Sequence, residues 1–189
     1  MRIIAGKLKG KKVEIPKNKK TRPLKDLVKE SIFNLLMHSN KITFQLRDSN
    51  ILDLYAGSGS FGLECISRSA KTVCFVEEEI NALKTLKENI KKLKVEKNTK
   101  IFSSDVLFLL KKKNIFKYKF DLIFCDPPYK YDSINKLIEL IFENSLLSKN
   151  GVIIFHRNKL SKEQFPNYFK LIDERIYGIS KIFFGKILY

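Results

Sequence analysis

The chain has 189 residues, 44% of them hydrophobic, which suits one domain that buries its own core without disulfide bonds. No apolar stretch approaches the roughly 18 residues of a membrane-spanning helix, and the first residues lack the apolar run of a secretion signal. These features exclude membrane-spanning and secreted disulfide-rich classes, and we expect a soluble cytoplasmic protein. The formal net charge of +17 favours a polyanionic partner.

Basic residues are concentrated at the N-terminus. Residues 1–25 hold ten Lys and Arg against one acid, Glu14, and so carry nine of the seventeen net charges. This distribution is more informative than the total charge, because an AT-rich genome could produce the general excess of Lys. Such a dense basic segment predicts a nucleic-acid contact that neutralises phosphates, with a solvated face as the alternative. The candidate contacts are Arg2, Lys7, Lys9, Lys11, Lys12 and Arg22.

The first 40 residues are expected to form a hairpin and a helix. Two short extended runs around Gly6 and Gly10 predict the hairpin, and Pro23 is placed to open the helix. One apolar stripe recurs at helical spacing, at Leu24, Leu27, Val28, Ile32, Leu35 and Leu36. Lys25, Lys29 and Glu30 are expected to point outward. We therefore divide the chain into a basic extension, residues 1–40, and a larger domain, residues 41–189.

Strands and helices alternate through the larger domain. Strands are predicted at residues 51–55, 73–77, 100–105, 120–125 and 152–156, and helices at about 61–68, 79–93, shortly after 105 and at 133–144. This alternation predicts an α/β fold with a parallel sheet covered on both faces, whose ligands bind beyond the carboxyl ends of the strands. Residues 169–177 and 181–189, separated by Gly178, predict a terminal antiparallel hairpin.

A glycine-rich loop joins the first strand to its helix. Residues 53–62 contain a full G-x-G-x-x-G, for which a dinucleotide enzyme is the obvious alternative. Asp53 separates the two possibilities, because a carboxylate there would repel a pyrophosphate and attract the ammonium group of a methionine-like tail. Glu77 ends the second strand, where an acid can accept both hydroxyls of a ribose.

Asp105 ends the third predicted strand and could accept from an adenine amino group. Three acids at successive strand ends therefore predict S-adenosylmethionine, which has an ammonium, a ribose and an adenine but no phosphate. Each acid alone could instead cap a helix, an alternative kept open above all for Asp105. The candidate cofactor contacts are Asp53, Ala56, Gly57, Ser58, Gly59, Gly62, Glu77, Asp105 and Val106.

The tetrapeptide Asp126-Pro127-Pro128-Tyr129 follows the apolar strand 120–125. Its prolines end the strand and leave carbonyls unpaired. Asp126 and the Pro127 carbonyl could grip an amino group in the plane of a base, while Tyr129 stacks on its face. We therefore predict methylation of an exocyclic nitrogen, with Asp126, Pro127 and Tyr129 as catalytic residues. A strand end followed by a simple turn is the alternative.

The cysteines and histidines are expected to be structural. Cys65, Cys74 and Cys125 show no C-x-x-C spacing and are predicted to be reduced core thiols. Strand alternation points Cys125 away from the pocket that Asp126 faces. His38 and His156 lie too far apart to indicate zinc, so we interpret both as structural or surface residues and predict no metal site.

With these motifs the chain resembles the class I methyltransferases, and among them the bacterial small-subunit ribosomal RNA guanine-N2 methyltransferases of the RsmD type. The resemblance covers essentially the whole length and rests on residues 2–6, 9–12, 22–23, 26–34, 53–62, 77 and 126–129. The basic leader is its most specific part, because the glycine loop and DPPY are shared with adenine-N6 DNA methyltransferases. Ala5, Leu24 and Lys29 replace the usual Gly, Thr and Arg.

The resemblance implies a Rossmann-like, mainly parallel seven-stranded sheet and methyl transfer from S-adenosylmethionine to N2 of one guanine in 16S ribosomal RNA of the small subunit. We expect a monomer with no membrane partner. One alternative is a DNA or large-subunit RNA adenine-N6 enzyme, but DNA enzymes usually carry an added recognition domain. Another is a non-catalytic RNA-binding assembly factor, against which the intact Asp126 and glycine turn argue.

Overall fold

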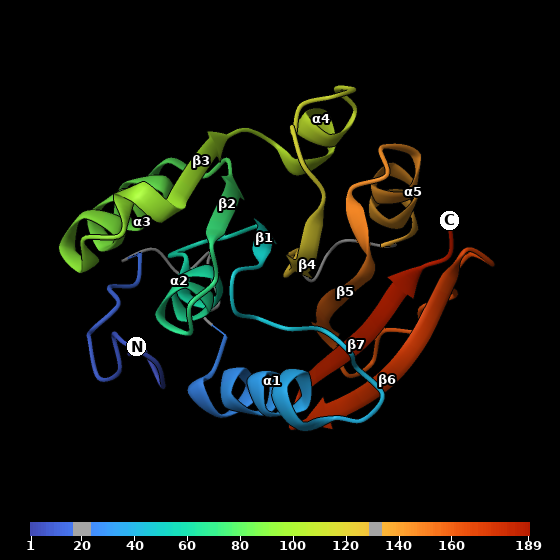
Figure 1. The fold of residues 1–189 in the computed structure, drawn as a ribbon, viewed down its shortest axis with the longest axis horizontal. Coiled ribbons are helices and arrows are strands. Elements are labelled where there is room, and N and C mark those ends of the chain that lie inside the picture. Colours follow the sequence, from blue (N-terminus) through green and yellow to red (C-terminus); the bar gives the residue numbers. More distant parts are fainter. Residues whose placement is uncertain (17–23, 129–133) are drawn as a thin grey trace.

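One seven-stranded sheet organises the part of the chain that the structure, a computed structural model, describes: residues 1–16, 24–128 and 134–189 (Figure 1). Arg22, Pro23 and Tyr129, which the sequence analysis singled out, lie outside these ranges. Within them, no helix combines the length and the apolar character that a membrane crossing requires.

The sheet has the order β3-β2-β1-β4-β5-β7-β6. Its strands are β1 Asn50–Leu54, β2 Thr72–Glu77, β3 Thr99–Ser103, β4 Phe120–Cys125, β5 Leu147–Asn158, β6 Phe169–Tyr177 and β7 Ser180–Ile187. The first five strands are parallel, and β7 pairs antiparallel with β5 and β6. The expected α/β fold, a mainly parallel sheet that ends in an antiparallel hairpin, is confirmed.

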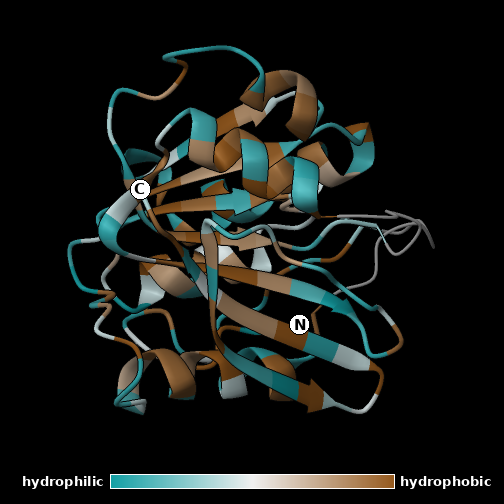
Figure 2. Cartoon of the chain, turned by 90° about the vertical axis from the view of Figure 1, so that its right-hand side faces the viewer, coloured by the Kyte–Doolittle hydropathy of each residue, from teal (hydrophilic) through white to brown (hydrophobic). Residues whose placement is uncertain are grey.

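Helices cover both faces of the sheet, so that the molecule has three layers (Figure 2). They are α1 Asp26–His38, α2 Ser60–Ser67, α3 Ile80–Leu93, α4 Val106–Leu110 and α5 Asn135–Glu143, with a short 3-10 helix, η1, at Glu96–Asn98. One hydrophobic cluster joins α1, α2 and α3 to the sheet, and a second joins α4 and α5 to the opposite face. Burial on both faces explains the near-continuous apolar runs of the central strands.

Stacked aromatic rings tie α1 and α2 to the sheet. The ring of Phe61 in α2 lies between Phe33 of α1, at 5.1 Å between centroids, and Phe124 of β4, at 3.9 Å. Offset-stacked rings contribute about 0.5–1.5 kcal/mol beyond their area burial. This stack fixes both helices over the end of β4, next to Asp126.

The N-terminal hairpin forms as predicted and packs against α2. Ile3 N donates to the Lys11 carbonyl and Val13 N to that of Met1, both at 2.9 Å. Gly6 has φ +81°, and a Cβ there would collide with the carbonyl oxygen of Ser67. Only glycine therefore fits this contact. Ile3 and Val13 are buried in the cluster shared with α1, α2 and α3, so the basic extension and the larger domain share one core.

Two side chains of α1 do not follow the predicted stripe. Lys29, expected to point outward, is 0% exposed, whereas Leu27, expected inside, is 70% exposed. Lys29 Nζ donates to the Arg2 carbonyl at 3.0 Å and lies 3.7 Å from the Glu64 carboxylate. Burial lowers the pKa of Lys29, and the carboxylates of Glu64 and Asp26 oppose that shift. Apolar periodicity could not reveal a buried counter-charge on another helix.

Candidate active site

Four neighbouring strands each place one ionisable side chain at the same edge and on the same face of the sheet. Glu77 ends β2, Asp53 lies near the end of β1, Asp126 directly follows β4, and His156 lies near the end of β5. Side chains alternate between the two faces of a strand. All four residues share their face with the hydrophobic cluster under α1, α2 and α3. The strand-end rule thus brings distant residues into one site.

Strand register sets Asp126 beside His156. Leu54 pairs with Cys125, and Cys125 with Phe155, so the next residues on β4 and β5 are neighbours on the opposite face. Cys125 lies in the cluster under α4 and α5, away from the site, as predicted. Burial raises the pKa of its thiol well above the usual range, which makes it a poor nucleophile.

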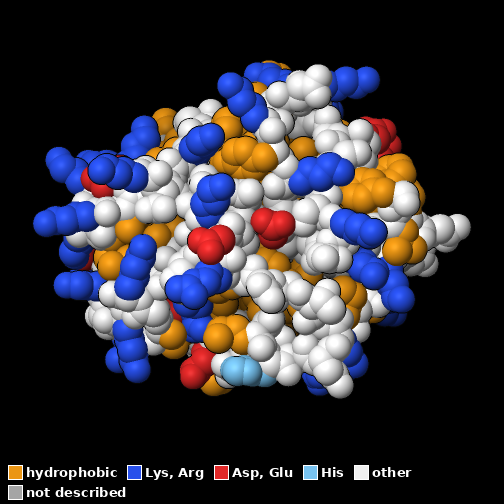
Figure 3. Space-filling view, viewed as in Figure 1, with side chains coloured by type: hydrophobic (Ala, Val, Ile, Leu, Met, Phe, Trp, Pro, Cys, Tyr) orange, Lys and Arg blue, Asp and Glu red, His pale blue; other side chains and the backbone are white. Residues whose placement is uncertain are grey.

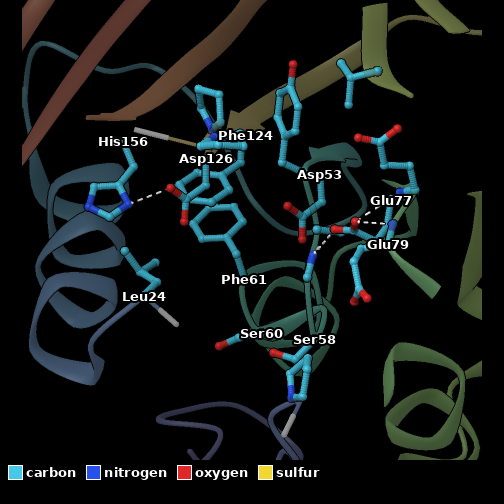
Figure 4. Close-up of a pocket in the computed structure, with 18 of the residues that line it drawn as sticks. Leu24, Asp53, Ser58, Ser60, Phe61, Glu77, Glu79, Phe124, Asp126 and His156 are labelled. Atoms are coloured by element: carbon cyan, nitrogen blue, oxygen red, sulfur yellow. Dashed lines mark hydrogen bonds and ion pairs between the residues drawn. The ribbon is translucent and has the colours of Figure 1, made fainter. Parts of the chain in front are cut away.

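These side chains line a cavity of about 360 Å³ (Figure 4). That volume lies within the roughly 300–1,000 Å³ typical of small-ligand sites. Its acids are Asp53, Glu77, Glu78, Glu79 and Asp126. Apolar side chains from the N-terminal segment and from α2 and β4 complete the wall. An acidic cavity in a chain of net charge +17 suits a ligand with a cationic group.

The glycine loop combines two roles. Ala56, Gly57 and Ser58 line the cavity, and Gly57 has φ +55°, a conformation that favours glycine. Gly59 and Gly62 instead pack against other side chains, since a Cβ on either would collide with Leu86 or Phe75. The structure therefore explains Gly59 and Gly62 by close packing of α2, and their direct contact with the cofactor stays a prediction.

Backbone donors hold the Glu77 carboxylate in place. Oε2 accepts from Gly57 N at 2.7 Å, and Oε1 accepts from Glu78 N at 3.0 Å and Glu79 N at 2.9 Å. A carboxylate oxygen can accept about two hydrogen bonds, so Oε2 keeps capacity for a ligand hydroxyl. This arrangement fits the predicted ribose contact.

Asp53 is a buried acid, 1% exposed, whose Oδ2 accepts from Gly62 N at 3.0 Å. Burial raises the pKa of its carboxyl well above the usual range, and the nearby carboxylates of Asp126 and Glu77 raise it further. A cation in the cavity would favour the ionised form. Asp53 therefore fits the ammonium group that the sequence analysis assigned to it, and the donor set as a whole fits S-adenosylmethionine.

Asp126 makes a contact that the sequence analysis missed. Its Oδ1 lies 2.9 Å from Nδ1 of His156, and Figure 4 shows the two side chains pointing toward one another. The carboxylate is 22% exposed, and Pro127 and Pro128 continue the cavity wall beside it. Interpreting His156 as only structural or surface was incomplete, since it lines the cavity. Its place at the end of a predicted strand was the available signal.

Asp105, which follows β3, is less well placed in the site than the acids of β1, β2 and β4. Asp105 is exposed and caps α4, where its Oδ1 accepts from Phe108 N at 2.7 Å. This is the helix-cap alternative considered from the sequence. The neighbouring Ser104 and Val106 line the cavity. The contact between Asp105 and an adenine amino group stays a prediction, with Val106 better placed on the wall.

The candidate RNA contacts that the structure describes, Arg2, Lys7, Lys9, Lys11 and Lys12, are all exposed on the N-terminal hairpin. Lys12 pairs with Glu14 at 3.2 Å. Lys and Arg side chains gather on the left of Figure 3, where Figure 1 places the N-terminal segment and α3. The hairpin thus presents a basic surface, and its contact with RNA stays a prediction.

Sequence comparisons identify close relatives. The family model described as Conserved hypothetical protein 95 matches residues 1–186. Ribosomal RNA small subunit methyltransferase D of Haemophilus influenzae is 35% identical over 181 residues, which span 95% of this chain and 90% of that protein. The protein of the same name from Escherichia coli K12 is 30% identical over 153 residues, 81% of this chain and 72% of the relative.

Solved structures agree with this relationship. The yhhF protein of Escherichia coli superposes with a TM-score of 0.84 at 26% identity, covering 99% of this chain and 97% of that chain. A Haemophilus influenzae structure described as a methylase gives 0.80 at 31% identity, covering 100% and 98%. The fold is that of the class I methyltransferases, which implies the use of S-adenosylmethionine. The chain belongs to the RsmD family of small-subunit ribosomal RNA methyltransferase D homologues.

Proposed function

We propose that this protein transfers a methyl group from S-adenosylmethionine to N2 of a guanine in 16S ribosomal RNA of the small subunit. The observation that carries the proposal is Asp126, which adjoins two prolines at the edge of a cavity suited to the cofactor. Among the described residues, no hydrogen bond occupies its Oδ2. The names of the relatives, small subunit methyltransferase D, support the choice of RNA.

The chain's own residues would hold the cofactor along the strand ends. Asp53, Glu77 and Val106 line the cavity, where Asp53 would face the ammonium group, Glu77 would accept a ribose hydroxyl and Val106 would lie against the adenine. Bound S-adenosylmethionine supplies an electrophilic methyl group on a sulfonium sulfur. The role left for Asp126 is then to bind the nucleophile.

The exocyclic amine of guanine is a weak nucleophile, because its lone pair is conjugated with the ring. Hydrogen bonds from N2–H to Asp126 and to the Pro127 carbonyl would favour a more pyramidal nitrogen. Tyr129 would stack on the base and hold the amine in line with the methyl group. Positioning and electrostatic stabilisation by these groups supply the catalysis.

The target base must leave its stack to enter the cavity. Phosphate contacts from the basic hairpin would fix the register of the RNA without reading its sequence. Selectivity would then come largely from the shape of the RNA, which an assembled particle fixes better than free RNA does. A ribosomal substrate would also place the protein in the cytoplasm, where we expect it to act as a monomer.

Tritiated methyl transfer tests the proposal directly. Small subunits from cells that lack the activity, large subunits, deproteinised RNA and duplex DNA are offered in parallel, and the labelled nucleoside is identified. We expect N2-methylguanosine, mainly from small subunits, and a strongly reduced rate of labelling with Asp126→Ala. Label recovered as N6-methyladenine, or a preference for DNA or large subunits, would contradict the assignment. Absence of transfer to all four would favour a non-catalytic assembly factor.

A further inference from the structure

Three side chains form a hydrogen-bonded row behind the proposed target amine. Asp126 Oδ1 lies 2.9 Å from Nδ1 of His156, and Nε2 of His156 lies 2.9 Å from Oγ of Ser180. His156 is 4% exposed and Ser180 is buried, whereas Asp126 faces the cavity. Both ring nitrogens of the histidine are thus engaged, one of them by the residue to which we assign the target amine.

The sheet builds this row from three strands. Asp126 and His156 follow paired residues of β4 and β5. Ser180 pairs with Asn158 across the antiparallel β5 and β7, two residues along β5 from His156 and on the same face. A diagonal neighbour of this kind is within reach of a long side chain. The position of the imidazole is therefore set by the backbone of three strands.

We infer that His156 is a positioning residue for the methyl transfer, acting through Asp126, a role that rests on the function proposed above. A hydroxyl donated by Ser180 to Nε2 selects the tautomer with its proton on Nδ1. That N–H then donates to Oδ1 of Asp126. The carboxylate is held in one orientation, with Oδ2 turned to the target amine.

This orientation matters because Asp126 lies near a second acid, Asp53, and would otherwise rotate about its last side-chain bond. As the bond from N2 to the methyl carbon forms and the carbon–sulfur bond breaks, the nitrogen gains positive charge and releases one proton to Oδ2. His156 keeps its own proton on the Oδ1 side throughout. The released proton thus stays on the oxygen that faces the cavity.

Two amide variants separate positioning from mere packing. In His156→Asn the amide nitrogen takes the place of Nδ1 and can still donate to Asp126, whereas in His156→Gln it takes the place of Nε2 and reaches only Ser180. We expect kcat on small subunits to change little in His156→Asn. It should fall on the order of 10- to 100-fold in His156→Gln, as for one hydrogen bond to a charged group.

The affinity for S-adenosylmethionine, measured by calorimetry, should be the same in both variants, since the cofactor acids are untouched. If His156 only filled space, Gln, which is closer to His in size, would preserve activity better than Asn. That reversed order, or an equal loss of kcat in both, would overturn the inference. Ser180→Ala is a milder probe that leaves the ring in place, and we expect a several-fold loss of kcat. An unchanged kcat in this variant would contradict the proposed role of Ser180 in orienting His156.

Failure of this inference can be told apart from failure of the proposed function. The wild-type chain is assayed in the same experiment, and its methylated nucleoside is identified. A wild-type product other than N2-methylguanosine would contradict the proposed substrate, whatever the variants do. A correct wild-type product combined with equal variants would contradict only the role of His156.

Discussion

The acidic cavity and the N-terminal hairpin differ in which part of each residue the fold holds in place, the side chain or the backbone. In the cavity, the side chains of Asp53 and Glu77 are buried and fixed by backbone donors. In the hairpin it is the backbone that is fixed, by Glu64 and Ser67, while the basic side chains remain exposed. The contrast matches the proposed function, in which a rigid cavity holds a small cationic ligand and the hairpin offers an adaptable surface to a polyanion.

The largest expected effect on stability lies at the contact between the hairpin and α2, the helix that follows the glycine loop. The Glu64 carboxylate accepts from Ile4 N at 2.8 Å and Ala5 N at 3.0 Å, and it pairs with the buried Lys29. Glu64→Ala would leave the Lys29 charge buried without this partner, at a cost of about 3–5 kcal/mol in the free energy of unfolding. Urea denaturation measures it.

A surface ion pair offers the matched control. Glu139 pairs with Lys136 at 2.8 Å on α5, with both side chains partly exposed. Glu139→Ala should cost no more than about 1 kcal/mol. Similar losses in Glu64→Ala and Glu139→Ala would mean that the hairpin is not anchored through Glu64. The same buried contacts make deletion of the hairpin unsuitable for testing RNA binding, because the deletion would also remove part of the core.

Substitution of Asp126 should lower kcat, whereas substitution of Glu77 should weaken cofactor binding. Asp126→Ala removes the proposed partner of the amine, so kcat should fall roughly 100- to 1,000-fold, as for loss of one transition-state contact, with cofactor affinity nearly unchanged. Asp126→Asn should retain some activity, because its amide oxygen can still accept a hydrogen bond from the amine, although it cannot take up the released proton. Glu77→Ala should weaken cofactor binding by about 1.5–3 kcal/mol. Calorimetry and turnover assays together decide, and loss of cofactor binding in Asp126→Ala would make the residue structural.

The sequence predicted the strand-end acids of the cavity and little of what surrounds them, for a physical reason. Asp53, Glu77 and Asp126 follow apolar runs, and parallel strands end at one edge of the sheet, so local pattern and one topological rule suffice. His156 and Lys29 depend on which elements become neighbours. Their partners, Asp126 and Glu64, are 30 and 35 residues away in the chain. Periodicity within one segment carries no information about such pairings.

The raised pKa of Asp53 predicts a pH-dependent cofactor site. Ammonium binding favours the ionised carboxylate, so affinity for S-adenosylmethionine should fall as the pH is lowered through the raised pKa. Asp53→Asn should bind about 1.5–3 kcal/mol more weakly and lose this pH dependence. Calorimetry across a pH series measures both, and identical pH profiles for the two proteins would exclude Asp53 as the ammonium partner.

The pH dependence of the stability contributed by Asp53 should run opposite to that of cofactor affinity. The folded protein keeps a proton that the unfolded chain loses at the usual pKa of Asp, so the contribution of this carboxyl group to wild-type stability is greatest below that pKa. It declines as the pH rises toward the raised pKa of the folded state. Asn resembles the protonated acid at every pH and can still accept from Gly62 N. Asp53→Asn should therefore melt at a higher temperature than wild type at neutral pH, and a lower melting temperature would contradict the stated cause of the shift.

The smallest effect per substituted residue is expected for the basic side chains on the hairpin surface. Lys7 and Lys9 are exposed, and their side chains take no part in anchoring the hairpin, so a Lys7→Gln, Lys9→Gln double variant should keep its stability and cofactor affinity. Each lost phosphate contact should reduce the slope of log affinity against log salt by about 0.7–0.9. Lys111→Gln with Lys113→Gln, exposed beyond α4, is the matched control and should leave the slope unchanged. Equal slopes in the two double variants, measured by RNA filter binding, would mean that the hairpin charges are only a solvated face.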